Sequence, residues 1–219
     1  MCLNNWGGID HKVLEFHEYV NLFSGKSGSG KSTVMDAIQV ILYGSFSPSF
    51  LNKAADDAKN RRSVLSYLRG EQKDGSANRK DCDFCSVIAL EIEDTGTHII
   101  TCIGIAFEVR KSDSEIKKFV YFSHSGKMPE SEYLTEQGVC YSNQEIKKLV
   151  SARTKSDDNR GKGEVNRIYG SKEAYLGTLY DVILGYIDQN RFITMEKSAI
   201  ALKMTNGTGQ FIRDYMFPK

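Results

Sequence analysis

Apolar and polar residues alternate along the middle of the chain with a period of two. From Ser86 onward this pattern fills three runs, SVIALEIE, THIITCIGIAFEVR and KKFVYFS. A period of two is typical of β-strands with one buried face. The runs are joined by DTGT and KSDSE, which contain residues that favour turns. The pattern therefore predicts an antiparallel meander of about three strands over residues 86–125.

An earlier part of the chain has the period of an α-helix. Apolar residues recur there at i, i+3, i+4, i+7 and i+8, on one helix face: Val34, Ala37, Ile38, Ile41 and Leu42. Gly44 follows at a position where helices commonly end. Further helices are predicted with Val64, Leu65 and Leu68 on one side, over NQEIKKLV, and from about Ser171. The segment GQFIRDYMF ends the chain in mid-pattern.

Two strands are predicted before the first helix. One lies around residues 13–16 and follows a turn at Gly7 and Gly8. The second is a buried strand over residues 19–23, interrupted by one polar residue, Asn21. Its apolar members are Tyr19, Val20, Leu22 and Phe23.

Between this strand and the helix lies GKSGSGKST, a full match to GxxxxGK[ST]. Glycines permit backbone conformations in which successive N–H groups turn inward and form an anion site. The helix that follows adds the positive end of its dipole. We expect Lys31 to reach the β- and γ-phosphates as the catalytic residue, and Ser32 to bind Mg²⁺ through its hydroxyl. The predicted cofactors are ATP and Mg²⁺, held by Gly25, Lys26, Ser27, Gly28, Ser29, Gly30, Lys31, Ser32 and Thr33.

Composition narrows the classes of function. The 219 residues carry a formal net charge of +1, which excludes a general polyanion binder. Five cysteines, no signal peptide and no apolar run long enough for a bilayer indicate a cytoplasmic protein without membrane contact. Basic residues gather in one segment, either as a solvated helix face or as a patch for nucleotide phosphate or DNA backbone: Lys53, Lys59, Arg61, Arg62 and Arg69.

The sequence lacks the parts that usually complete a P-loop ATPase. Hydrolysis normally needs an apolar strand that ends in Asp-Glu, to position Mg²⁺ and the attacking water. VILGYID ends in Asp188, but Gln189 follows and the preceding residues keep a helical period. GTGQ at residues 207–210 lacks the Ser-Gly-Gly core of an ABC signature. We therefore expect the chain to bind a nucleotide without hydrolysing it alone.

This combination resembles the N-terminal half of the head domain in SMC-like and SbcC-like chromosome ATPases. GKSGSGKSTVMDAIQVILYG is similar to the family's GxNGSGKSTIIDAI run, including Asp36, although Ser27 stands where most members have Asn. FLNKAADDAKNRRSVLSYLRG and RFITMEKSAIALKMTNGTGQFIRDYMF resemble the MukB-like group, especially the condensin-like ATPase of Wadjet defence systems (JetC, also called MksB-like or EptC). The resemblance extends over nearly the whole chain.

The resemblance implies an α/β fold of the P-loop NTPase type. Its expected form is an ABC-type head lobe, with an antiparallel β-meander subdomain and a parallel or mixed sheet around the P-loop helix. We expect one N-terminal lobe over residues 1–219. It divides into a P-loop region (1–50), a basic helix and loop (51–85), the meander (86–125) and helical segments (126–219).

The resemblance also implies partners and further site residues. The partners are the chain's own C-terminal half, a second head in a homodimer, kleisin and winged-helix subunits, and double-stranded DNA. ATP would join two heads and hydrolysis would release them, in DNA loop extrusion, plasmid defence or DNA maintenance at a bacterial nucleoid. Gln189 is a candidate Mg²⁺ contact with Lys203 as its rival, and Arg62 and Arg69 are candidate DNA contacts. Trp6 is either an adenine-stacking residue or a core residue.

Two other interpretations stay open. A P-loop small-molecule kinase fits the length, but it needs an arginine-bearing lid over a parallel sheet, where this chain has a meander. Phosphoryl transfer to a small acceptor by this chain alone would favour the kinase. A nucleotide-binding module without turnover is compatible with the head fragment.

Overall fold

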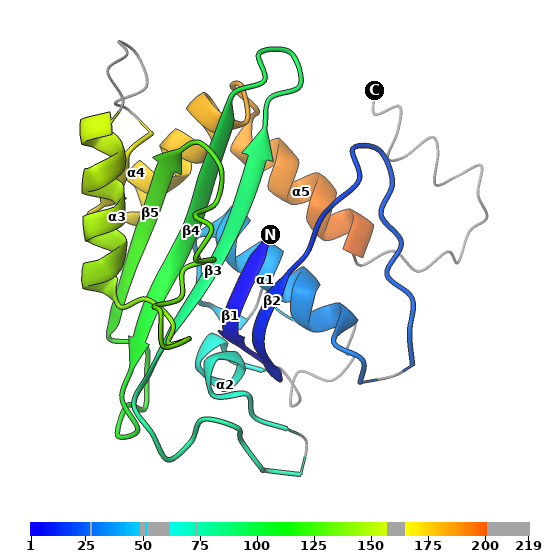
Figure 1. Cartoon of the computed structure of the whole chain (residues 1–219). Helices are drawn as coiled ribbons and strands as arrows, with labels where there is room; N and C mark the ends of the chain where they lie inside the picture. The colour runs from blue at the N-terminus through cyan, green and yellow to red at the C-terminus, as the bar shows by residue number, and fades with distance from the viewer. Residues whose placement is uncertain (27, 49–50, 52–61, 73, 157–164, 201–219) are drawn as a thin grey trace, which may run out of the picture.

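The computed structural model describes residues 1–26, 28–48, 51, 62–72, 74–156 and 165–200 (Figure 1). Its elements, in chain order, are β1 (Cys2–Trp6), β2 (Ile9–Val13), α1 (Lys31–Tyr43), α2 (Val64–Arg69), β3 (Phe84–Glu93), β4 (Ile100–Val109), β5 (Lys118–Ser125), α3 (Asn143–Ser156), β6 (Arg167–Tyr169), α4 (Lys172–Gly177), the π-helix η3 (Thr178–Ile183) and α5 (Gln189–Ile200). The segment GQFIRDYMF and the basic residues Lys53, Lys59 and Arg61 lie outside the described residues.

The strands form one six-stranded sheet in the order β2-β1-β3-β4-β5-β6, and every neighbouring pair is antiparallel. β3 and β4 pair without a break from Phe84↔Val109 to Glu93↔Ile100, and β5 pairs with β4. The predicted meander is therefore confirmed, as is the turn at Gly7 and Gly8 between β1 and β2. The described residues do not form the parallel or mixed sheet that was predicted around the P-loop helix.

β1 is a strand that the hydrophobic pattern did not predict, because its sequence CLNNW contains two asparagines. Asn4 is nevertheless buried, and its side-chain amide donates to the Glu132 carbonyl at 2.8 Å. This hydrogen bond, between residues distant in sequence, satisfies the buried Asn4 amide, so burying Asn4 costs little free energy. The strand predicted around residues 13–16 is instead β2, which ends at Val13.

Two hydrophobic cores cover the opposite faces of the sheet. Side chains alternate between faces along β4, so Ile103, Ile105 and Phe107 join the core that contains α1, α2 and α4. Ala106 joins the second core, to which α3 contributes Ile146. In Figure 1, α3 and α1 accordingly lie on opposite sides of the sheet. This packing holds α1 against the sheet and sets the phosphate-binding loop at one end of that helix.

The predicted strand over residues 19–23 is wrong. This segment belongs to no strand, and Tyr19, Val20 and Leu22 are 81%, 78% and 89% exposed. Figure 1 draws the stretch between β2 and α1 as a long tube outside the layers. A strand needs backbone partners, and β2, at the edge of the sheet, pairs with β1 alone among the described strands. Apolar composition alone therefore does not make this segment a strand.

The predicted helices are confirmed where the structure describes them. α2 begins after Ser63, whose hydroxyl accepts from the Ser66 N–H, and α3 extends beyond NQEIKKLV to Ser156. The helix expected from about Ser171 begins as α4 and widens from Thr178 into the π-helix η3. The apolar face of this helix is largely buried, since Leu176, Leu179 and Tyr180 are at most 5% exposed.

Candidate functional site

The loop before α1 contains glycines in the left-handed region of backbone conformation. Gly28 and Gly30 have φ angles of 85° and 88°, which residues with a Cβ rarely adopt. Ser29 closes a turn by donating its N–H to the Lys26 carbonyl at 3.2 Å. Ser27 lies outside the described residues. The described part of the loop therefore fits the phosphate-binding conformation that the glycine spacing predicted.

The first turn of α1 is open to an anion. The helix begins at Lys31 after the N-cap Gly30, which offers no side-chain hydrogen bond, and its first turn holds no acidic residue. The first N–H groups of a helix have no partner within the helix, and they carry its positive partial charge. Ser32 is exposed in this turn, as a Mg²⁺ ligand must be. These features fit a triphosphate with its magnesium ion.

Lys31 lies across the loop rather than out in solvent. Its ammonium group donates to the Gly25 carbonyl at 2.6 Å, the Lys26 carbonyl at 2.9 Å and Ser29 Oγ at 3.3 Å. All three acceptors belong to the loop, so the positive charge already sits at the cradle. The oxygens of a bound phosphate would compete with these acceptors, because charge-assisted bonds to phosphate are stronger than bonds to neutral carbonyls.

The last turn of α1 is held by three tyrosine hydroxyls. Tyr175 donates to the Ile41 carbonyl at 3.0 Å, and Tyr180 donates to the Leu42 carbonyl at 3.0 Å. Tyr121 donates to the carbonyl of the C-cap residue, Gly44, at 2.6 Å. Burial raises the pKa of Tyr121 and of Tyr180 to about 12, so both remain protonated donors. These donors satisfy helix-end carbonyls where the last turn has no basic residue, and the sequence pattern gave no sign of them.

Trp6 is a core residue and is not available to stack on adenine. Its side chain is 0% exposed and stacks on Tyr67, with ring centroids 5.0 Å apart and planes 9° apart. The indole N–H donates to the Thr33 carbonyl at 2.8 Å, so Trp6 holds the first turn of α1. Asp36, the acidic residue in the run that resembles the SMC-like family, is also buried. Its carboxylate accepts a hydrogen bond from the hydroxyl of Tyr67, the residue on which Trp6 stacks.

Gln189 is not brought to the phosphate-binding loop by any hydrogen bond among the described residues. It is the first residue of α5, and Asp188 before it accepts the Arg191 N–H at 2.7 Å. Asp188 therefore starts a helix and does not end a strand, which agrees with our rejection of VILGYID as the missing Asp-Glu strand. α5 contacts α1 elsewhere, since Gln39 donates to Glu196 at 3.1 Å. Lys203, the rival of Gln189 for the predicted Mg²⁺ contact, lies outside the described residues.

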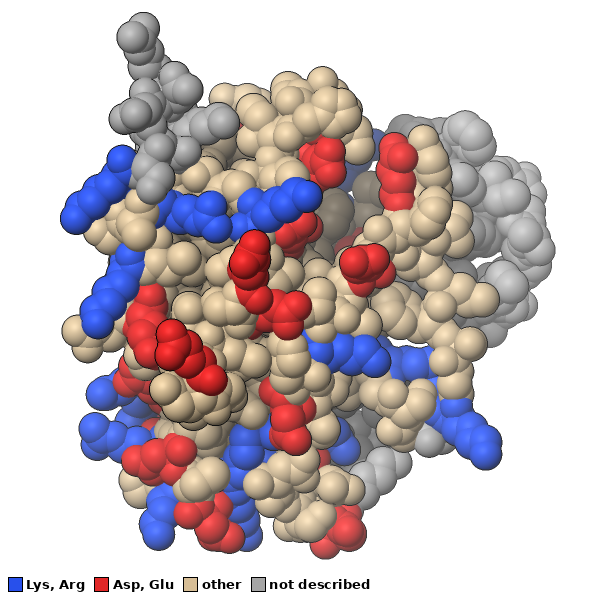
Figure 2. Space-filling view, viewed as in Figure 1, with Lys and Arg blue, Asp and Glu red and all other residues tan. Residues whose placement is uncertain are grey.

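The two candidate DNA-contact arginines differ in how they are held. Arg69 donates through Nη2 to the Lys111 carbonyl at 3.2 Å and to the Asp113 carbonyl, so one side of its guanidinium holds the β4–β5 turn. Arg62 lies over the Tyr67 ring, 5.6 Å from its centroid. Figure 2 shows acidic and basic side chains mixed over much of the visible face, with a short row of basic side chains at its upper left.

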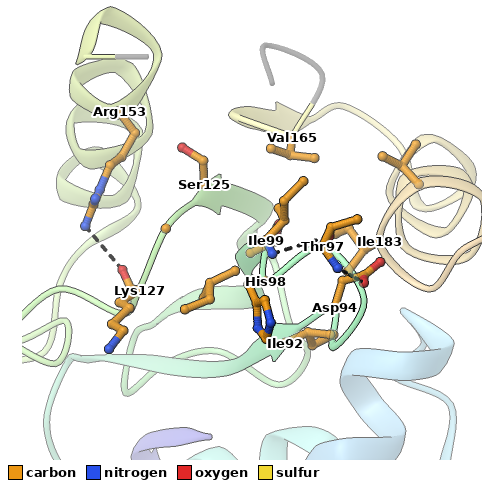
Figure 3. Close-up of a pocket in the computed structure, with 14 residues that line it drawn as sticks. Ile92, Asp94, Thr97, His98, Ile99, Ser125, Lys127, Arg153, Val165 and Ile183 are labelled. Atoms are coloured by element: carbon orange, nitrogen blue, oxygen red, sulfur yellow. Dashed lines mark hydrogen bonds between the residues drawn. The ribbon is translucent and has the colours of Figure 1, made fainter. Parts of the chain in front are cut away.

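A separate cavity of about 620 Å³ lies beside the β3–β4 turn and does not include the phosphate-binding loop (Figure 3). Its apolar wall includes Ile92, Ile99 and Ile183. Two of its charged groups are already engaged. Asp94 accepts the Thr97 and Gly96 N–H groups, which lower the pKa of its carboxyl, and Arg153 donates to the Lys127 carbonyl at 3.2 Å. The predicted nucleotide site, the open loop at α1, shares no lining residue with this cavity.

Comparison with protein families agrees with the loop geometry. Residues 1–58 match the family described as the P-loop containing region of AAA domain. The matched part includes β1, β2, the loop and α1, so this region is of the P-loop NTPase type, which indicates nucleotide binding. No curated protein matches the chain. None of the described helices has both the length and the apolar character needed to cross a membrane.

Proposed function

We propose that this chain is the ATP-binding N-terminal half of an SMC-like ATPase head, closest to the MukB-like group and the ATPase of Wadjet systems. One observation carries the proposal. On the helix side of the P-loop, α1 is fully formed and buries its apolar face. On the strand side, the apolar segment is exposed, with Leu22 at 89%. A P-loop that is followed by a packed helix but not preceded by a strand fits a domain in which further strands complete the sheet.

ATP would bind with its phosphates at the loop and the first turn of α1. Backbone N–H groups of residues 25–33 surround the phosphates, and Lys31 moves from the loop carbonyls to the β- and γ-phosphate oxygens. Ser32 provides one oxygen ligand for Mg²⁺, which neutralises phosphate charge when it is bound. Gln189 remains a proposed second contact to the ion.

The C-terminal half would complete what this chain lacks. It would add strands beside residues 19–23 and supply the Asp-Glu pair, while the signature would come from a second engaged head. Hydrolysis then requires two complete heads, and ATP acts both as substrate and as part of their interface. In this proposal the kleisin and winged-helix subunits and double-stranded DNA are partners of the assembled heads, with Arg62 and Arg69 as DNA contacts.

Titration calorimetry with ATP and Mg²⁺ tests the nucleotide site. The Lys31→Ala variant should bind about 100-fold more weakly than the unchanged chain, because it loses two or three charge-assisted bonds to phosphate. Lys148→Ala is the matched control, since Lys148 is exposed on α3, a helix that packs on the opposite face of the sheet from α1, and it should bind normally.

Two results would count against the proposal. Equal affinity of the unchanged chain and Lys31→Ala would show that the loop does not bind ATP. Steady-state ATP hydrolysis by the purified chain alone would show that no second half is required, and phosphoryl transfer to a small acceptor would favour a kinase.

A further inference from the structure

Groups from two separate elements converge on the first turns of α1. The Trp6 indole donates to the Thr33 carbonyl at 2.8 Å, and the Tyr67 hydroxyl donates to the Asp36 carboxylate. The two elements are joined to each other as well, because the Gly7 N–H donates to the Tyr67 carbonyl at 2.7 Å. The β1–β2 turn and α2 therefore form one support beneath the start of the P-loop helix.

This support is closely packed. Trp6, Tyr67 and Asp36 are 0%, 2% and 4% exposed, and the two rings are stacked. Gly7 lies directly under Thr33, since a Cβ at Gly7 would come within 2.6 Å of the Thr33 methyl group. Any rotation of α1 about its axis would break directional hydrogen bonds and compress these contacts. The apolar face of a helix alone allows more such rotation, because hydrophobic contacts have little directionality.

The support acts on the face of α1 that carries the predicted magnesium ligand. Asp36 follows Ser32 by four residues, so the two side chains project from the same side of the helix, one turn apart. Fixing Asp36 therefore fixes the rotation of the helix turn from which the Ser32 side chain projects. Mg²⁺ needs near-ideal octahedral geometry with short bonds to oxygen, so a small change in that direction weakens its coordination.

We propose that Tyr67, acting through Asp36, is a positioning residue for the Mg²⁺ ligand Ser32, with Trp6 supporting the same turn. This inference rests on the proposed ATP site and assigns a role to a residue that touches neither nucleotide nor metal. Tyr67 sets the helix rotation, and its loss affects the Mg²⁺-dependent part of ATP binding more than the phosphate contacts of the loop.

The test compares ATP affinity in Mg²⁺ and in EDTA for Tyr67→Phe and Tyr180→Phe. Tyr180→Phe is the matched control, because it removes a hydroxyl that bonds α1 at its opposite end, at the Leu42 carbonyl. Tyr67→Phe should reduce the gain in affinity that Mg²⁺ provides by about tenfold, the lower end of the range for loss of a group that orients a metal ligand. Its affinity in EDTA should stay within about twofold, and Tyr180→Phe should change neither value.

Trp6→Phe provides a second variant if Tyr67→Phe does not fold. It keeps a stacked ring, removes the donor to Thr33, and should show the same Mg²⁺-specific loss. Equal Mg²⁺ gains in Tyr67→Phe and Tyr180→Phe, in a chain that binds ATP through Lys31, would overturn this inference alone. If the unchanged chain and Lys31→Ala bind ATP equally, the proposed ATP site fails instead.

Discussion

The two flanks of the phosphate-binding loop differ sharply. On the C-terminal side, α1 buries Ile41 completely, and its two ends are held by aromatic side chains from other elements. On the N-terminal side, residues 14–24 form no strand or helix, and Val20 and Leu22 are mostly exposed. Both flanks are rich in apolar residues, so composition does not explain the contrast.

The difference shows which part of a nucleotide site this chain can build by itself. A helix makes its backbone hydrogen bonds internally and needs only one face covered, which this sheet provides for α1. A strand depends on neighbouring strands for every backbone bond. The loop and its helix are therefore formed here, while Tyr19, Val20 and Leu22 on the strand side keep their side chains exposed.

The largest expected contrast is in core packing. Ile41→Ala should lower the free energy of unfolding by about 4 kcal/mol, because it opens a cavity at a fully buried position of α1. Leu22→Ala should change it by less than about 0.5 kcal/mol. Urea unfolding followed by circular dichroism measures both values. A large loss in Leu22→Ala would mean that the strand flank is packed in solution, and the comparison would fail.

The buried His124 should make the stability of the fold sensitive to acid. Burial lowers the pKa of His124 to about 4, while Nε2 lies 2.9 Å from the Tyr133 hydroxyl oxygen and Nδ1 lies 3.1 Å from the Ser125 carbonyl, an arrangement that suits a neutral ring. The unfolded chain takes up a proton near pH 6.5 and the folded chain does so only near pH 4, so stability falls as the pH drops between these values. The loss should be about 2 to 3 kcal/mol.

Replacing each histidine tests this assignment. His124→Gln should flatten the pH dependence of the unfolding free energy between pH 6.5 and 4, whatever its stability at pH 7. His17→Gln, in the exposed flank, should keep the full dependence of the unchanged chain. If both variants kept the same slope, another group would cause the acid sensitivity.

The smallest expected contrast concerns single hydroxyl groups. Tyr175→Phe removes the donor to the Ile41 carbonyl and should cost about 1 kcal/mol, the usual contribution of one buried hydrogen bond. Tyr19→Phe removes a hydroxyl from a residue that is 81% exposed and should leave the melting temperature unchanged. Thermal unfolding of the two variants side by side decides this. Equal melting temperatures would show that the tyrosine contact does not stabilise the end of α1.

Periodicity and spacing predicted those parts of the fold that follow local rules. The meander followed from a period of two with turn residues between the runs, and α1 from its apolar face and Gly44. The positive φ angles of Gly25, Gly28 and Gly30 agree with the glycine spacing of the motif, because such conformations depend on local sequence. The same reasoning failed for residues 19–23 and for β1, since strand pairing and buried asparagines depend on distant partners.

By itself, then, the sequence determined a phosphate-binding loop, the helix behind it and an antiparallel meander. Only the tertiary structure decided that Tyr67 holds Asp36, 31 residues away, and that Tyr175 reaches Ile41 across 134 residues. It also decided that Trp6 lies in the core and that the strand flank stays exposed. The physical reason is range. Backbone conformation and helix amphipathicity depend on neighbours a few residues apart, whereas burial and the partners of polar groups depend on how distant segments pack.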